Sequence, residues 1–393
     1  MNNSAYITCF FKMVLTLLVV CTLTLVPYSV WWLAKSGDVA LDAATSKQAT
    51  GEFALAGFGI AQDFVEYKLA LYRKVHPTIA VVGSSRVMQV RGKYFSKKFL
   101  NIGGTAGNLS ILRSTLDAMV REHKPEVILL GLDFWWFTPK WEAKPEAIVP
   151  PSSGSYVWSF EALKKPYEWL LTGKITPRTF FAPLLGEFQD NRYGIMAQRG
   201  SDGFGTDGSW YYTSQVTGTE KPFDFQFGDT RKEVSYGIKA FAPAPELSQG
   251  HLDVFAEIYC SLRARGIQVY VFIPPLSPLI LAEMRQREAQ YPQLFGLREA
   301  LEQRGIAVMD FTDARMVGSS DCEFVDGFHG GQVTYARMLR EMTDRNHALV
   351  AYMDVQKLDS DIMAYKGHAF VPDPLVTSVP EIDFMRFNCP KRP

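Results

Sequence analysis

The sequence predicts a doubly wound α/β domain, built on a parallel sheet and preceded by an N-terminal transmembrane helix. Three observations support this prediction: short apolar runs, helical segments that separate them, and one long uncharged run near the N-terminus. Strands buried on both faces of a parallel sheet give continuous rather than alternating apolar runs. Alternation of such strands with helices is typical of a sheet that helices cover on both sides.

Five runs have the length of strands and are rich in Val and Ile, namely 78–83, 99–104, 126–134, 268–275 and 307–311. Apolar residues at helical spacing predict helices over 53–75, 108–123, 251–265, 279–304 and 331–350. Asn108 is a good N-cap for the second helix, and Gly266 is a C-cap for the third. The α/β domain is therefore expected to comprise residues 76–134 and 251–350.

The remaining segments have different compositions. Residues 135–250 are rich in Gly, Pro and aromatic residues, and we expect one aromatic-rich insertion there, with hairpins at its Asp-Gly turns. Residues 36–75 are expected to form a short polar linker, over 36–52, followed by a helix. Residues 351–393 form a Pro-rich C-terminal tail.

The N-terminal run extends over residues 13–34 and contains 22 residues without a charge. About 20 apolar residues span a bilayer as a helix, whereas a cleavable signal peptide has an apolar region of about 7–15. An uncleaved anchor over 1–35 is therefore favoured, with Trp31 and Trp32 at the membrane interface. Lys12 and Lys35 flank the run evenly, so the charges do not decide its orientation. We expect the N-terminus on the cytoplasmic side, because a lone span before a large domain commonly acts as a signal-anchor.

The charge and the cysteines limit the classes of function. Lys+Arg and Asp+Glu number 41 each, so no overall field favours nucleic acid. The Cys and His residues lack zinc-site spacing. Outside the anchor region lie three cysteines, Cys260, Cys322 and Cys389. One disulfide and one free thiol is one arrangement, and the sequence does not choose the pair.

Polar residues follow the predicted strands, where sites of open α/β sheets gather. Ser84 and Ser85 follow the first strand, Asp133 follows the third, and Asp326 and His329 precede the last helix. A serine nucleophile needs a base, usually histidine, and the histidine needs a carboxylate that fixes its tautomer. We therefore expect Ser85, His329 and Asp326 to form a triad, with Ser84 shaping the bend. The competing interpretations are an ordinary turn and a helix-capping histidine.

Four motifs in the same order resemble the SGNH (GDSL-like) hydrolase superfamily: Gly83-x-Ser85, Asn101 with a Gly-rich turn, Gly131-x-Asp133, and Asp326-x-x-His329. The chain is most similar to the membrane-anchored branch that acylates cell-envelope polymers, which includes alginate and cellulose acetylation proteins and the teichoic-acid D-alanylation protein. Residues 272–278 (FIPPLSP) are also similar to that branch. The resemblance implies a flavodoxin-like three-layer sandwich over 76–134 and 251–350.

The resemblance also implies roles for individual residues. Ser85 matches the nucleophile, His329 the general base and Asp326 its orienting carboxylate. The oxyanion hole would contain the Ser85 amide and the amide of a glycine in the second motif. That motif is one residue longer than usual, so Gly104 and Gly107 both qualify, and we favour Gly107 because it is next to the helix start.

Asp133 departs from the family, which usually has an asparagine that donates to the oxyanion. An ionised carboxylate cannot donate, and loss of one such donor costs about 10²–10³ in rate. Three interpretations keep the site active: Asp133 points elsewhere, it is protonated, or Asn108 donates in its place. A slow or non-catalytic site is the fourth.

Three residues are candidate substrate contacts: Arg86, Asn108 and Trp135. Arg86 would bind an anionic group of the substrate, or else form a salt bridge on a helix surface. The aromatic residues of 134–142 and 209–212 would stack on sugar rings, or else pack the insertion onto the sheet.

Together these features predict a single-pass protein of the bacterial inner membrane with a periplasmic or extracellular catalytic domain. It would transfer an acyl group, above all acetyl, to an exported polysaccharide or other envelope polymer. The resemblance implies a multi-spanning membrane-bound O-acyltransferase as the partner that supplies the acyl group. No metal, organic cofactor or nucleic acid is implied. The alternatives are a carbohydrate esterase with the same triad, and a non-catalytic polysaccharide-binding or scaffold subunit, which Asp133 favours.

Overall fold

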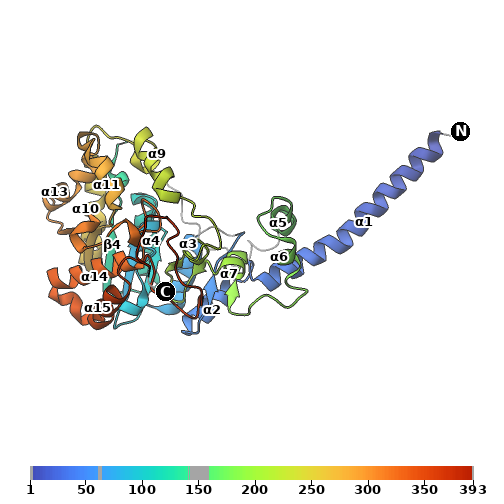
Figure 1. Ribbon diagram of the computed structural model, residues 1–393, viewed down its shortest axis with the longest axis horizontal. Helices are drawn as coiled ribbons and strands as arrows, with labels where there is room; N and C mark the ends of the chain where they lie inside the picture. Colours follow the sequence, from blue (N-terminus) through green and yellow to red (C-terminus); the bar gives the residue numbers. More distant parts are fainter. Residues whose placement is uncertain (1–2, 61–63, 140, 142–158, 392–393) are drawn as a thin grey trace.

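The computed structural model describes residues 3–60, 64–139, 141 and 159–391, so parts of the predicted insertion and of the helix predicted over 53–75 lie outside the described residues. A five-stranded parallel sheet forms its centre, in the order β3-β2-β4-β8-β9 (Figure 1). Its strands are β2 (Ile79–Gly83), β3 (Phe99–Gly103), β4 (Val127–Gly131), β8 (Gln268–Ile273) and β9 (Val308–Asp310). All five predicted strands are therefore confirmed.

Helices cover both faces of this sheet. On one face lie α3 (Phe64–Val75), α4 (Leu109–Glu122) and α10 (Gln249–Ala264), which pack on alternate strand residues such as Ala80 and Val82. On the other face lie α14 (Gln332–Arg345) and α15 (Val355–Ala364), on the intervening residues. The fold is thus α/β with a central parallel sheet between helical layers. The predicted N-cap is confirmed, since Asn108 Oδ1 accepts the Ile111 amide at 2.8 Å.

Short elements complete the chain between β8 and β9 and within the insertion. The former are α11 (Pro278–Arg285), α12 (Pro292–Phe295) and α13 (Leu297–Glu302), where one or two helices are predicted over 279–304. The insertion contains α5 (Phe160–Leu171), α6 (Pro177–Phe181), α7 (Ile195–Gly200), α8 (Thr213–Val216) and α9 (Gly228–Tyr236). Its strands β5 (Arg192–Tyr193), β6 (Gly203–Phe204) and β7 (Trp210–Tyr211) join β1 (Leu55–Ala56) in a small sheet, β5-β1-β6-β7.

An Asp-Gly turn closes a hairpin in the insertion, as predicted. Strands β6 and β7 pair antiparallel, and Asp207-Gly208 lies in the turn between them. Gly208 has a φ of +74°, a left-handed conformation that glycine adopts without strain.

The segment predicted as a linker is folded. It contains the helix α2 (Leu41–Ala49), which packs against α3. Of the helix predicted over 53–75, the structure shows Phe64–Val75 as α3, whereas Leu55 and Ala56 pair with the insertion in the small sheet. The first difference arises from packing against α3 and the second from pairing with the insertion, and the local pattern reveals neither contact.

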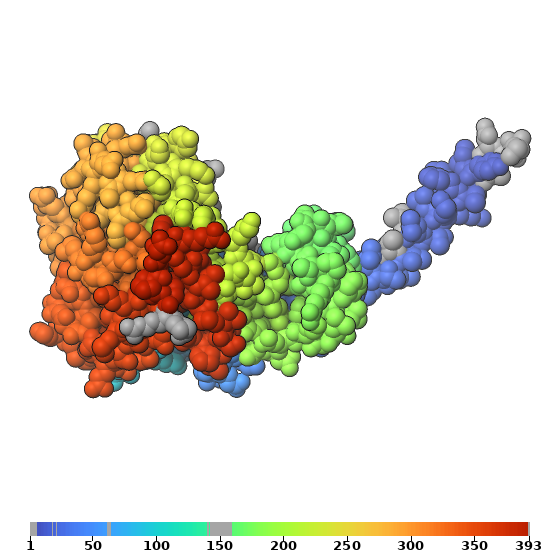
Figure 2. Space-filling model, in the orientation of Figure 1, coloured from blue at the N-terminus to red at the C-terminus, as the bar shows by residue number. Residues whose placement is uncertain are grey.

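The N-terminal helix α1 (Asn3–Ser36) is long and apolar enough to cross a membrane. It projects away from the rest of the molecule, and only its C-terminal end meets the insertion (Figures 1 and 2). There Trp32 is completely buried, and its indole Nε1 donates to the Phe180 carbonyl at 2.9 Å. The prediction that Trp32 lies at a lipid interface is therefore wrong, because protein covers its ring.

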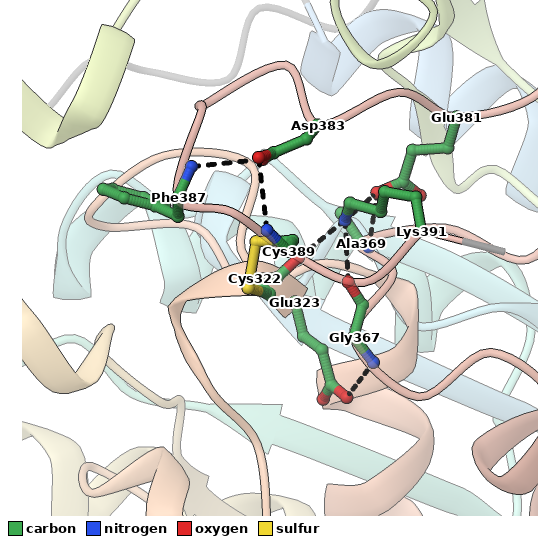
Figure 3. Close-up of a disulfide and its surroundings, with 9 residues drawn as sticks. All are labelled: Cys322, Glu323, Gly367, Ala369, Glu381, Asp383, Phe387, Cys389 and Lys391. Atoms are coloured by element: carbon green, nitrogen blue, oxygen red, sulfur yellow. Dashed lines mark hydrogen bonds and ion pairs between the residues drawn. A yellow bond between two sulfur atoms is a disulfide. The ribbon is translucent and has the colours of Figure 1, made fainter.

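The C-terminal tail is folded onto the α/β domain. A disulfide joins Cys322, just before the Asp326 loop, to Cys389 in the tail, and Cys260 is a free exposed thiol (Figure 3). Next to the disulfide, the Lys391 ammonium contacts Glu381 at 2.5 Å and donates to the Gly367 carbonyl at 2.7 Å. The disulfide pair that the sequence left open is thus Cys322 with Cys389.

Removal of this disulfide should lower stability. It joins residues 67 positions apart, and loss of a disulfide that closes a loop of that length lowers the free energy of unfolding by about 2–4 kcal/mol. Urea unfolding of the full chain in mild detergent should show this loss for the double variant Cys322→Ser/Cys389→Ser. Cys260→Ser is the matched control and should unfold like the wild type. Equal stability of the double variant and the control would contradict the structural role of the disulfide.

Candidate active site

Ser85 lies where β2 ends and the chain turns into one turn of 3-10 helix, Ser85–Val87. The Ser84 hydroxyl accepts the Arg86 amide at 3.2 Å, so Ser84 caps the turn as expected. Asn101, in β3, holds the turn from the neighbouring strand, since its Nδ2 donates to the carbonyls of Val87 and Val90 at 2.9 Å each. The turn is therefore fixed from two sides while the Ser85 side chain stays partly exposed.

The three predicted triad residues meet at the carboxyl edge of the sheet. Ser85 Oγ lies 2.9 Å from His329 Nε2, and His329 Nδ1 lies 2.7 Å from Asp326 Oδ2. An ionised carboxylate can only accept, so Nδ1 carries the proton toward Asp326 and Nε2 is left to accept from the serine. This is the arrangement in which a histidine takes the proton of an attacking serine.

Asp326 is held in place by its own loop. Its Oδ1 accepts the amides of Phe328 at 2.7 Å and His329 at 2.6 Å, while Oδ2 receives the ring. The Asp326 side chain is 3% exposed, whereas the His329 side chain is 18% exposed. The carboxylate is thus shielded from water, and the part of the site that is open to a substrate is formed by the histidine and the serine.

Asp133 forms a completely buried ion pair with Arg86. The Arg86 Nη1 lies 3.1 Å from Asp133 Oδ1, and both side chains are 0% exposed. Burial raises the pKa of Asp133 to about 6, and the Arg86 guanidinium opposes this rise. At pH 7 the carboxyl group is therefore ionised and paired, rather than protonated.

Arg86 is not free to bind an anionic substrate, and this prediction is wrong. Its Nη2 donates to the carbonyls of Pro274 at 2.7 Å and Pro275 at 2.9 Å, next to the end of β8. The Tyr335 hydroxyl, from α14, donates to the Arg86 carbonyl. Arg86 therefore ties the serine turn to β4, to the segment after β8, and to a covering helix.

Sequence reasoning missed the part that Pro274, Pro275 and Tyr335 play in this network. The two prolines lie within the FIPPLSP stretch, so that similarity was the available signal. Tyr335 had no signal of its own, because it looks like any apolar residue of a buried helix face.

The amides near Ser85 limit the choice of oxyanion donors. The Gly104 amide already donates to the carbonyls of Gly83 at 3.1 Å and Ser84 at 2.9 Å, so it is not available. Within the described ranges, the amides of Ser85 and Gly107 have no acceptor. Gly107 is exposed, and its carbonyl accepts Trp141 Nε1 at 3.1 Å.

The structure excludes one of the two side-chain alternatives for the oxyanion donor, Asp133. Asp133 can only accept, and it is paired with Arg86. Asn108 uses its Oδ1 to accept the Ile111 amide at the α4 cap, and this leaves its Nδ2, the group that would donate, uncommitted to the cap, so donation by Asn108 stays a prediction.

Aromatic residues pack beside the triad. The Trp135 ring lies 5.1 Å from Phe328, the neighbour of His329, and 6.2 Å from Trp141. Trp135 is 6% exposed, so its face is not open to stack on a sugar, and that prediction is wrong. Trp210 is also buried, against Phe204 at 4.7 Å. The packing interpretation holds for both rings.

No family model, curated protein or solved structure matches this chain.

The Arg86–Asp133 pair gives a prediction about stability. Arg86→Met leaves the Asp133 carboxylate buried without its counter-ion, which should cost about 3–5 kcal/mol of unfolding free energy in urea titrations at pH 7. Arg86→Met/Asp133→Leu removes both charges and should cost less. Arg113→Met, which breaks an exposed pair with Glu257, is the control and should cost under about 1 kcal/mol. A loss for Arg86→Met no larger than that of the control would show that the pair is not buried.

The pKa of Asp133 gives a pH dependence. Its folded value of about 6 lies above the ordinary value of about 4, so the folded chain binds this proton more tightly than the unfolded chain. The contribution of Asp133 to unfolding free energy therefore falls as the pH rises from about 4 to about 6, by up to about 1.4 kcal/mol per pH unit. Urea titrations across this window should show a steeper fall for the wild type than for Asp133→Asn. Parallel curves would contradict the raised pKa.

Proposed function

We propose that the chain is a membrane-anchored serine acyltransferase of the SGNH type, acting outside the cytoplasm through an acyl-enzyme on Ser85. The observation that carries the proposal is the hydrogen-bonded series Ser85–His329–Asp326, assembled from positions 244 residues apart. The strand order supports it, because in chain order it is 2-1-3-4-5, the order of flavodoxin-like sheets. Ser85 follows the first of these strands, at the switch point where such sheets bind ligands.

The geometry suits a two-step acyl transfer. Ser85 Oγ attacks the carbonyl carbon of an ester or thioester while His329 Nε2 takes its proton, and Asp326 stabilises the imidazolium. The amides of Ser85 and Gly107 stabilise the oxyanion, and His329 returns the proton to the leaving group. In the second step His329 removes the proton of an acceptor hydroxyl, which attacks the acyl-Ser85 ester and regenerates the serine.

The proposed compartment and acceptor rest on features outside the site. The Cys322–Cys389 disulfide is typical of oxidising compartments, and α1 is apolar enough to anchor the chain in a membrane. An enzyme in that position meets exported polysaccharides and other envelope polymers, so a sugar hydroxyl is the proposed acceptor and acetyl the proposed group. A multi-spanning membrane-bound O-acyltransferase would supply the acyl group from the cytoplasmic side.

The reason to favour a non-catalytic subunit was Asp133, and the ion pair with Arg86 now accounts for that residue. A paired carboxylate supports the serine turn and is neutralised next to the site. The serine then relies on backbone amides for the oxyanion, which predicts a slower enzyme than one with a third donor.

Replacement of Ser85 or His329 should abolish the acyl chemistry. Full-length protein in detergent should hydrolyse a chromogenic acetyl ester and gain an acetyl increment in intact mass, and Ser85→Ala or His329→Ala should lower the rate at least about 10³-fold. Ser84→Ala is the control and should keep the rate within about tenfold, since Ser84 caps the turn and hydrogen-bonds Asp133 but is not one of the three triad residues. Addition of an envelope glycan separates acetyl transfer from acetyl release. An inert wild type that never gains the acetyl increment would overturn the proposal.

A further inference from the structure

The C-terminal end of α1 is enclosed by the protein. Here α5, α6 and the turn after α6, residues 160–185, are called the collar. The last two turns of α1 form a separate small core with the collar, in which Trp32 and Leu33 are completely buried against Trp169 and Phe180. Figures 1 and 2 show these segments between the projecting helix and the main body.

Hydrogen bonds show how far along α1 the collar reaches. The Tyr28 hydroxyl donates to the Phe180 carbonyl at 2.7 Å, and the Tyr167 hydroxyl donates to the Leu25 carbonyl at 2.5 Å. Protein therefore covers α1 from about Tyr28 onward, inside the apolar run of 13–34, and one hydrogen bond reaches back to the Leu25 carbonyl. The apolar residues near the end of that run are accounted for by packing against the collar.

The uncovered part of α1 has the length of a bilayer span. From Tyr6 to Val26 the described side chains are exposed or half-exposed. At 1.5 Å per residue these 21 residues extend about 30 Å, the thickness of the hydrocarbon core. Lys12 lies within this stretch, near its cytoplasmic end, where a lysine can extend to the headgroups. A bilayer centred on this stretch ends where the collar begins.

The collar itself carries exposed apolar side chains. They are Phe160 (78%), Leu171 (85%), Phe181 (47%), Leu184 (61%) and Leu185 (62%). Single exposed apolar residues are ordinary. Five within one short segment next to a transmembrane helix indicate a surface that is buried against something else in the working protein.

Two placements connect these side chains to α1. Along α5, Phe160, Leu163, Tyr167 and Leu171 follow the spacing i, i+3, i+7 and i+11 and therefore lie on one face of the helix. Two of them already bind α1. The Leu163 carbonyl accepts the Ser29 hydroxyl, and the Tyr167 hydroxyl donates to the Leu25 carbonyl. The Phe181 ring lies 5.1 Å from the Phe180 ring, which itself lies 5.1 Å from Tyr28. The exposed apolar surface is thus continuous with the surface that already binds the anchor.

We infer that the collar lies in the outer lipid interface, with these five side chains inserted among the headgroups and first acyl carbons, and that the bilayer span is residues 6–26 rather than 13–34. A helix with one apolar face binds such an interface in its plane. The collar would then fix the height of the α/β domain above the membrane. The inference rests on the proposed membrane anchor and is independent of the proposed acyl chemistry.

The test uses full-length chain in vesicles of phosphatidylethanolamine and phosphatidylglycerol. Cys9, Cys21 and Cys260 are replaced by Ser, and one new cysteine at a time carries an environment-sensitive fluorophore. The collar sites are Phe181→Cys, Leu184→Cys and Leu185→Cys. The matched control is Met363→Cys, an equally exposed apolar residue (76%) in α15, and Leu17→Cys reports the span.

Collar labels should emit at shorter wavelength than the Met363 label. They should also be quenched severalfold less by aqueous iodide and severalfold more by lipids with a spin label near the headgroup. The vesicles contain no other protein and on average one chain each. Such protection therefore cannot come from a partner protein or a second copy.

Leu17 lies near the middle of the span, so its label is read with lipids that carry the spin label near the end of the acyl chain. If the collar labels behave like the Met363 label while the Leu17 label is quenched by these lipids, the collar inference is overturned and the anchor stands. If the Leu17 label is not quenched by lipid, the anchor proposal fails and the collar inference fails with it. Neither result bears on acyl-enzyme formation, which is measured separately in detergent.

Discussion

The buried ion pair between Arg86 and Asp133 fixes the edge of the sheet on which the candidate site is built. One guanidinium binds the carboxylate after β4 and two carbonyls after β8, while its own backbone carries the serine turn after β2. Both charges are out of water, so the pair is tolerated only because each neutralises the other and the guanidinium meets further acceptors. Ser85 is the residue before Arg86, and its position depends on this contact.

The same pair explains how a carboxylate occupies the place of an expected oxyanion donor. Asp133 is bound to Arg86 beside the serine turn, and in the proposed mechanism the oxyanion is stabilised by the backbone amides of Ser85 and Gly107. A carboxylate without Arg86 would repel a developing oxyanion, whereas a paired carboxylate presents little net charge. Trp135 packs at the same edge of the sheet. Its ring is buried and lies 5.9 Å from the central carbon of the Arg86 guanidinium.

The sequence predicted the parts of the fold that depend on local pattern. The five strands and the cap of α4 were found, since continuous apolar runs and an N-cap residue are local signals. The triad was also predicted, because strand ends of a parallel sheet converge and Asp326 lies three residues before His329. The helix α2 and the strand β1 were missed, because α2 depends on packing against α3 and β1 depends on pairing with the insertion.

Pairings between distant residues were likewise beyond the sequence. Arg86 and Asp133 lie 47 positions apart in the sequence, and nothing in this spacing indicates that they form a buried pair. The burial of Trp32 was missed for a similar reason, since an apolar helix end looks the same whether lipid or protein covers it. Such choices are decided by packing between elements, which periodicity does not encode.

The central claim is that Ser85 is a nucleophile activated by His329. The most direct measurement is reaction of the full-length protein with a fluorophosphonate, followed by peptide mapping of the adduct by mass spectrometry. The account predicts one adduct, on Ser85, which is lost in His329→Ala and retained in Ser84→Ala. An adduct on another residue, or labelling of Ser85 that does not depend on His329, would contradict it.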